Sequence, residues 1–265
     1  MDPLFRWAGS KKKLLSSIKD RFPKEYRAYH EPFCGSACLF FDILPNKAVL
    51  SDMNGELIQA YTEIKNSPEA VAECLGRLNV SEDEYYKVRS LDANSLLPAE
   101  RAARFIYLNR LCFNGVYRTN KNGQFNVPMG TKTGKLPEFD DLIEYSKALQ
   151  GVDLKCGDFG TALANIKKND LVYLDPPYSK PGTRKRGEYG PNSFNYTDIE
   201  RLVEVLDRID KKKAFFILSY SDCGVIRDVL KSDWNIQGVS VRRHVAGFSA
   251  HRKVVEELIV SNFKN

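Results

Sequence analysis

Short apolar runs alternate along this chain with stretches in which every third or fourth residue is apolar. The short runs, bounded by turn residues, are typical of buried strands, and the spaced pattern predicts amphipathic helices. We expect strands at 29–31, 48–51, 154–156, 170–174, 214–218, 239–241 and 257–260. We expect helices beginning at Cys38 and over 68–78, 98–111 and 198–209, with capping boxes at Ser81–Glu84 and Thr197–Glu200.

The order of these elements predicts a fold class and a division into domains. Strand, small-residue loop, helix and strand follow one another over 29–52, which is a βαβ unit. The same alternation resumes after residue 150, so we expect an α/β sheet with helices on both faces. Between them the pattern is mainly helical, with an Asn-Gly hairpin turn at 120–123. We therefore predict one domain from 1–55 and 151–265, and an inserted domain at 56–150.

Composition excludes some classes of protein. The chain has 265 residues and no run of 18 apolar residues, so we expect no membrane span. The N-terminal segment lacks the charged and apolar regions of a signal peptide. Six cysteines form no C-x-x-C pair and only three histidines occur, so we expect no metal site and reduced thiols in a cytoplasm.

Positive charge is gathered in four short clusters, within a formal net charge of +6. The clusters lie at 11–13, 184–186, 242–244 and 251–253. Each one alone is as consistent with a solvated surface as with phosphate binding. The four together favour a nucleic acid as partner.

The segment Asp175-Pro176-Pro177-Tyr178 carries the strongest chemical signal. It follows a buried apolar run, and two consecutive prolines force a turn there. Ligands of open α/β sheets bind at this end of a strand. Asp175 and the carbonyl of Pro176 can accept hydrogen bonds from an exocyclic amine of a base, and Tyr178 can stack on that base. A structural Pro-Pro turn is the alternative, which the flanking acid and aromatic residue disfavour.

Four further segments suit a nucleoside-like ligand. Gly35, Ser36 and Ala37 form a small-residue loop before a helix, which can present backbone N–H groups to an anionic group. Asp52 ends the next strand, where an acid typically binds ribose hydroxyls. Asp158 beside Phe159 suits an adenine ring, while Trp7 offers a flat wall and Lys11 a cation. Taken singly, each segment is also compatible with an ordinary turn or core position.

Together these motifs resemble those of the Dam-like DNA adenine-N6 methyltransferases, the D12 class. The family's K-W-A-G-G-K pattern is matched by residues 6–11, its E-P-F-x-G-x-G by 31–37 and its D-P-P-Y by 175–178. Residues 107–115 and 125–128 are similar to its recognition domain. The resemblance implies a Rossmann-like fold that binds S-adenosylmethionine (AdoMet), and an inserted target-recognition domain that carries a β-hairpin.

The resemblance also implies an activity and a set of site residues. The protein would flip an adenine out of duplex DNA and methylate its exocyclic amine, releasing S-adenosyl-L-homocysteine and using no metal. The catalytic residues would be Asp175, Pro176, Pro177 and Tyr178. The AdoMet site would comprise Trp7, Lys11, Phe33, Gly35, Ser36, Ala37, Asp52, Asp158, Phe159 and Asp175.

DNA contacts are implied in the same way. Phe113 would enter the stack vacated by the flipped base, and Arg118 would read guanine. The full set of expected DNA contacts is Arg6, Phe113, Asn114, Val116, Arg118, Arg184, Lys185, Arg186 and Arg252. Residues 179–195 would close over the flipped adenine, and Tyr196 would line its pocket with Tyr178.

Four departures from the family pattern bear on the target. Arg6 stands where the family commonly has Lys, Ala37 where it has Gly, Phe113 where some relatives have Tyr, and Thr131 where some have a base-contacting Arg. GATC, the family's usual target, is therefore an expectation to be tested. Cytosine-N4 or RNA adenine methylation, and a DNA-binding protein without catalysis, are the alternatives.

The resemblance sets expectations for partners and location. We expect a monomer that acts on double-stranded DNA, in the cytoplasm of a bacterium or of a phage-infected cell. A cognate restriction endonuclease is a candidate partner.

Overall fold

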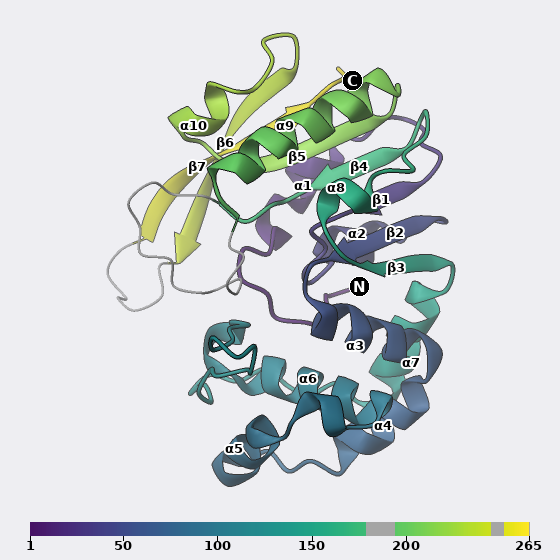
Figure 1. The fold of residues 1–265 in the computed structure, drawn as a ribbon, viewed down its shortest axis with the longest axis vertical. Helices are drawn as coiled ribbons and strands as arrows, with labels where there is room; N and C mark the ends of the chain where they lie inside the picture. The colour runs from purple at the N-terminus through teal and green to yellow at the C-terminus, as the bar shows by residue number, and fades with distance from the viewer. Residues whose placement is uncertain (179–193, 245–251, 265) are drawn as a thin grey trace.

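One sheet organises the molecule (Figure 1). The structure is a computed structural model that describes residues 1–178, 194–244 and 252–264, without the side chains of 241–244 and 252–255. In this part of the chain the strand order is β3-β2-β1-β4-β5-β7-β6. The strands are β1 (Tyr29–Glu31), β2 (Ala48–Asp52), β3 (Val152–Cys156), β4 (Leu171–Leu174), β5 (Phe215–Ser221), β6 (Asn235–His244) and β7 (Arg252–Ser261).

Strands β3, β2, β1, β4 and β5 pair in parallel, whereas β7 runs antiparallel to both β5 and β6. The expected strands are all present, which confirms the α/β class. The last two are longer than predicted, at ten residues each. They pair with each other along their whole length. Polar residues and a glycine interrupt β6, which hid its length from a search for apolar runs.

Helices follow most of the parallel strands. They are α1 (Leu15–Lys19), α2 (Cys38–Ile43), α3 (Gly55–Asn66), α4 (Pro68–Gly76), α5 (Glu82–Ser90), α6 (Pro98–Leu111), α7 (Phe139–Leu149), α8 (Phe159–Ala162), α9 (Tyr196–Lys211) and α10 (Gly224–Arg227). Three short 3-10 helices lie at Lys12–Leu14, Ala93–Ser95 and Phe113–Gly115. The predicted bounds of α6 are confirmed.

The sheet is covered on both faces. Leu171 and Tyr173 of β4 belong to a core shared with α2, α3, α6 and α7, whereas Val172 and Leu174 belong to a core shared with α8 and α9. Alternate residues of a strand point to opposite faces, so a strand apolar at every position must be buried on both sides. This explains why the apolar run before Asp175 is continuous.

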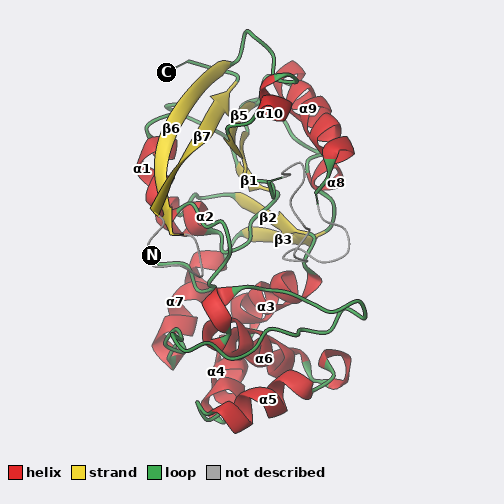
Figure 2. Cartoon of the chain, turned by 90° about the vertical axis from the view of Figure 1, so that its left-hand side faces the viewer, coloured by secondary structure: helices red, strands yellow, loops and turns green. Residues whose placement is uncertain are grey.

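The helices α3–α7 lie beyond the β3 edge of the sheet (Figures 1 and 2). They stand between β2 and β3 in the chain. Their core is continuous with one face of the sheet, and the N-terminal segment enters it. Phe5 packs edge-on against Tyr61 of α3 at 4.9 Å and Phe105 of α6 at 5.1 Å between ring centroids. The division at residues 55 and 150 stays our proposal.

Two local predictions are refined by the structure. The cap of α9 is Asn195 rather than Thr197: its Oδ1 accepts from the N–H groups of Thr197 and Asp198, and the Asp198 carboxylate accepts from the N–H of Asn195. Asparagine is the stronger cap, so the helix begins two residues earlier. The turn at 120–123 forms, but its arms meet in a single bridge between Thr119 and Phe125.

No helix in the described ranges combines the length and the apolar character that crossing a bilayer requires.

Candidate functional site

The carboxyl ends of four neighbouring parallel strands, β3, β2, β1 and β4, lie along one side of the sheet. This side is the edge at which the candidate site lies. Glu31 ends β1, Asp52 ends β2 and Asp175 follows β4, although these residues are far apart in sequence. The direction in which strands are added to the sheet reverses beside β1: the chain moves from β1 outward to β2 and β3, and then returns to place β4 on the other side of β1. Such a switch point is where open α/β sheets bind their ligands.

The Asp-Pro-Pro-Tyr corner meets the N-terminal segment at this edge. Lys11 Nζ lies 2.5 Å from Asp175 Oδ1, 3.1 Å from the Gly9 carbonyl and 4.9 Å from the Tyr178 ring centroid. Lys11 is only 4% exposed, so its ammonium is held in place rather than solvated. An ion pair of this kind fixes the direction of the Asp175 carboxylate.

Two residues of the C-terminal strands hold Tyr178. Its hydroxyl donates to Glu257 Oε2 of β7 over 3.1 Å, and its ring packs against Tyr220 of β5 at 5.1 Å. Glu257 is 1% exposed. A buried hydrogen-bonded phenol and a ring contact restrict both side-chain torsions of Tyr178, which fixes the plane of its ring.

The loop after β1 is tied to the end of β2. Gly35 N–H donates to Asp52 Oδ2 over 3.0 Å, and Asn54 N–H donates to Asp52 Oδ1 over 2.9 Å. Gly35 has a φ of +46°, and a Cβ placed there would lie 2.6 Å from Cδ1 of Trp7. Glycine is required at this position for both reasons. Trp7 in turn stacks on Tyr117 at 5.9 Å.

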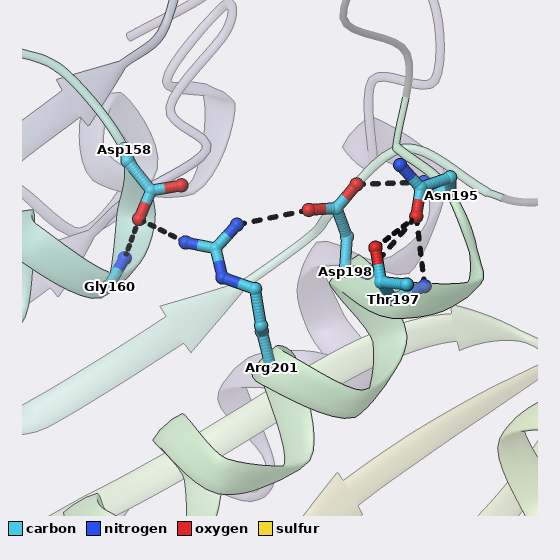
Figure 3. Close-up of polar contacts among 6 residues, drawn as sticks. All are labelled: Asp158, Gly160, Asn195, Thr197, Asp198 and Arg201. Carbon is cyan, nitrogen blue, oxygen red and sulfur yellow. Dashed lines mark hydrogen bonds and ion pairs between the residues drawn. The ribbon is translucent and has the colours of Figure 1, made fainter.

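An aromatic cluster and a charged network lie at the same edge of the sheet, apart from the Lys11–Asp175 pair. Phe33 lies 5.1 Å from Phe159 and 6.1 Å from Phe194, between ring centroids. Asp158 belongs to the charged network (Figure 3): its Oδ1 accepts from the Gly160 N–H at 2.9 Å and from Arg201 at 2.6 Å.

Arg201 joins this end of the site to the start of α9. Its other nitrogen donates to Asp198 over 3.0 Å, and its guanidinium lies 5.0 Å from the Phe159 ring centroid. One side chain therefore orients a carboxylate and covers a ring, both of which were predicted to hold an adenine.

Buried acids give the edge an unusual electrostatic character. The pKa of Glu31 is raised to about 8: burial is the largest cause and the nearby carboxylates of Asp175 and Asp52 add to it, while hydrogen bonds from the Tyr29 hydroxyl and the Phe40 backbone oppose the rise. Burial also raises the pKa of Asp52, against the hydrogen bonds from Asn54 and Gly35. Desolvation dominates because the charged form loses more hydration than these contacts return.

The predicted recognition loop follows α6. Phe113 is 49% exposed, and Asn114 has a φ of 54°. The Phe113 N–H donates to the Pro128 carbonyl over 2.9 Å. Arg118 Nε donates to Asn126 Oδ1 over 2.9 Å across the hairpin turn, and Val116 is partly buried.

Not all predicted residues gather at the edge. Ser36 and Ala37 are buried, and the part of their backbone in ligand binding stays a prediction. Tyr196, at the start of α9, is 55% exposed, and its place in a base pocket stays a prediction. Most of 179–195, with Arg184, Lys185 and Arg186, lies outside the described residues, as does the side chain of Arg252.

Four residues that sequence reasoning missed contribute to the site: Glu31, Phe194, Arg201 and Glu257. Glu31 stood inside a matched motif and was passed over as a strand residue. Arg201 lies one helical turn after Asp198, a spacing that predicts an ion pair on α9. No local pattern joins Glu257 to Tyr178, because 79 residues separate them.

A largely parallel α/β sheet whose strand order reverses beside β1 is typical of a Rossmann-like fold. The D12 class N6 adenine-specific DNA methyltransferase family matches residues 7–245. This chain therefore belongs to that family, which confirms the resemblance.

Its relatives include methyltransferases from several microbes. The type II methyltransferase M1.LlaDCHI of Lactococcus lactis subsp. cremoris is 35% identical over 99% of this chain and 96% of its own length. M.MjaIII of Methanocaldococcus jannaschii is 35% identical over 98% of this chain and 99% of its own length. The DNA adenine methylase of Escherichia coli K12 is 30% identical over 96% of this chain and 92% of its own length.

Proposed function

We propose that this protein is a site-specific DNA adenine-N6 methyltransferase that uses AdoMet. The observation that carries the proposal is the Asp175 carboxylate, held by Lys11 at the carboxyl end of β4 beside the fixed ring of Tyr178. A carboxylate and a neighbouring backbone carbonyl are suited to accept hydrogen bonds from the two N–H groups of an exocyclic amine.

The residues present fit AdoMet along the edge. When bound, AdoMet supplies an electrophilic methyl group on a positively charged sulfonium. Phe33 and Phe159 offer apolar rings to its adenine, and Asp158 offers an acceptor for the adenine amine. Asp52 keeps lone pairs for ribose hydroxyls beyond those used by Gly35 and Asn54. Trp7 and Lys11 stand at the other end, where a carboxylate would lie.

The protein's part in the reaction is placement and charge. Asp175 and the Pro176 carbonyl accept hydrogen bonds from the two N6–H groups, which makes the nitrogen lone pair available for attack. Tyr178 stacks on the flipped base, and its contacts with Glu257 and Tyr220 keep that surface rigid. Preorganised dipoles of this kind give most of the catalysis in such a transfer.

For DNA, we propose Phe113, Asn114, Val116 and Arg118 as the contacts from the recognition loop and hairpin. Arg184, Lys185, Arg186 and Arg252 are proposed to bind phosphates, and Tyr196 to line the adenine pocket. GATC is the proposed target. A cognate endonuclease, a monomeric state and a cytoplasmic location belong to the same proposal.

Expression in a methylation-free host, followed by long-read sequencing of its DNA, tests the modified base and the target together. We expect N6-methyladenine at one motif. Asp175→Ala should reduce methyl transfer about 10²- to 10³-fold, since an acceptor in the transition state is lost. A wild-type chain that methylated no DNA would favour a binding protein without catalysis, and an Asp175→Ala variant with wild-type rate would remove the assignment of Asp175.

A further inference from the structure

The exposed loop at the end of α6 needs a support. Its residues Asn114 and Gly115 both have positive φ angles, 54° and 65°, and Phe113 projects with 49% exposure. A non-glycine residue in the left-handed region is strained unless its surroundings over-determine it. The contacts beneath the loop show what holds it.

Arg6 lies under this loop. Its Nη1 donates to the carbonyl of Arg110 over 3.0 Å and to that of Cys112 over 3.3 Å. These carbonyls belong to the last turn of α6 and its C-cap. The negative end of the helix dipole lies here, so a guanidinium is favoured electrostatically as well as by hydrogen bonding.

Arg6 is also in van der Waals contact with the loop backbone. A Cβ on Gly115 would lie 2.4 Å from Cβ of Arg6 and 3.1 Å from its Nε. The loop can therefore take this conformation only with a glycine at 115 resting on the Arg6 side chain.

The position of Arg6 is itself fixed. Its N–H donates to Asn109 Oδ1 over 2.8 Å, and Asn109 Nδ2 donates back to the Arg6 carbonyl over 2.8 Å. Asn109 is 2% exposed, so this reciprocal pair is anchored inside α6. The next residue, Trp7, packs against Gly35 of the proposed AdoMet site.

We propose that Arg6 is a positioning residue that holds the loop 112–116 in its DNA-binding shape before DNA arrives. The proposal deepens the proposed function and rests on it for the role of Phe113 and Asn114. It differs from the expectation that Arg6 contacts DNA, because its Nη1 donates to the protein carbonyls of Arg110 and Cys112. A loop ordered in advance loses less conformational entropy on binding.

Hydrogen exchange of the DNA-free protein tests the support directly. In Arg6→Met, which keeps the aliphatic stem, the amides of 113–116 should exchange about tenfold faster than in wild type. Arg6→Lys should lie between the two, since an ammonium can also bind the last carbonyls of a helix. Unchanged exchange in Arg6→Met would overturn the proposal.

Kinetics separates positioning from base reading. Arg6→Met should raise KM for DNA about tenfold, with AdoMet affinity within about twofold of wild type and an unchanged ratio of rates on cognate and one-base-altered sites. An Arg6 that reads a base would instead lose discrimination at a single base pair. That result would overturn positioning as its role.

Gly115→Ala tests the contact between Arg6 and the loop by changing the loop residue. Its Cβ would displace Arg6, so it should reproduce the faster exchange, and the double variant with Arg6→Met should be less than additive. Gly123→Ala is the matched control: its φ is +78°, but no atom lies within 4 Å of an added Cβ. Additive effects of Gly115→Ala and Arg6→Met on loop exchange would contradict the positioning role of Arg6. Equal loop exchange in Gly115→Ala and Gly123→Ala would contradict it as well.

The two proposals fail separately. Loop exchange is measured without DNA or methyl transfer, so it reports on Arg6 even if the wild type methylates nothing. Should Arg6→Met fail to fold, Gly115→Ala against Gly123→Ala still decides the role of the contact.

Discussion

Gly35 carries two constraints at the residue scale: a left-handed backbone and a close approach to the Trp7 indole. Gly35→Ala should lower AdoMet affinity at least about tenfold, because either the loop or Trp7 must move away from the ligand site. Isothermal titration calorimetry measures the AdoMet affinity of the variant and of wild type. Gly123→Ala, with a similar positive φ in open space, should keep wild-type affinity. Equal affinities for the two variants would contradict the fit proposed for AdoMet.

Glu31 gives a pH prediction at the same scale. Its pKa is raised from 4.5 to about 8 in the folded protein, so the native state holds a proton that the unfolded chain has released. The stabilisation is complete below pH 4.5 and is lost as the pH rises through 8. Glu31→Gln cannot release this proton. Relative to the variant, wild type should lose about 1–4 kcal/mol of unfolding free energy between pH 5 and 9.

Urea unfolding at several pH values measures that loss. Glu25→Gln, which removes an exposed carboxyl, is the control for the substitution itself. If the stabilities of wild type and Glu31→Gln ran parallel across the range, Glu31 would not be the buried proton site.

At the scale of elements, Arg201 and Arg208 of α9 both bind the start of α8, Arg208 through the Gly160 carbonyl. Arg201 contacts Asp158 and Asp198 (Figure 3), and its guanidinium also lies over the Phe159 ring. Exposed ion pairs contribute little to stability, so Arg201→Met should change it by less than about 1 kcal/mol. The same substitution should weaken AdoMet binding about three- to tenfold, because Asp158 loses its fixed direction.

Arg227→Met provides the comparison for this prediction. Arg227 makes an equally close ion pair with Asp222, away from Asp158. Its replacement should leave AdoMet affinity unchanged. A similar loss in both variants would indicate a general charge effect and not a contact at the adenine end.

At the scale of the whole molecule, charge governs the encounter with DNA. The formal net charge is +6, and the chain contains four basic clusters. Binding that neutralises phosphates releases counterions, so the DNA affinity should fall about 10- to 10³-fold between 50 and 200 mM salt. AdoMet affinity should change by less than about twofold over that range. Fluorescence anisotropy with labelled DNA checks the first expectation, and a DNA affinity independent of salt would contradict it.

Much of the fold could be predicted from local patterns. The strand before Asp175 is apolar at every position, and α6 shows its period and its N-terminal proline, so both were placed correctly. The start of α9 and the length of β6 were not. A cap is chosen by geometry among several candidates, and an exposed edge strand needs no apolar run because its partner supplies the hydrogen bonds.

Local sequence was enough to propose the chemistry, because the Asp-Pro-Pro-Tyr corner, the small-residue loop and the acid that ends β2 are short segments whose residue types suit the proposed roles. Tertiary structure alone decided which of them touch. Lys11 meets Asp175 across 164 positions, and Arg6 reaches the end of α6 across more than 100. Contacts of this separation depend on how helices and strands pack, which no local period encodes. The role of Arg6 beneath the recognition loop is therefore an inference that only the folded chain supports.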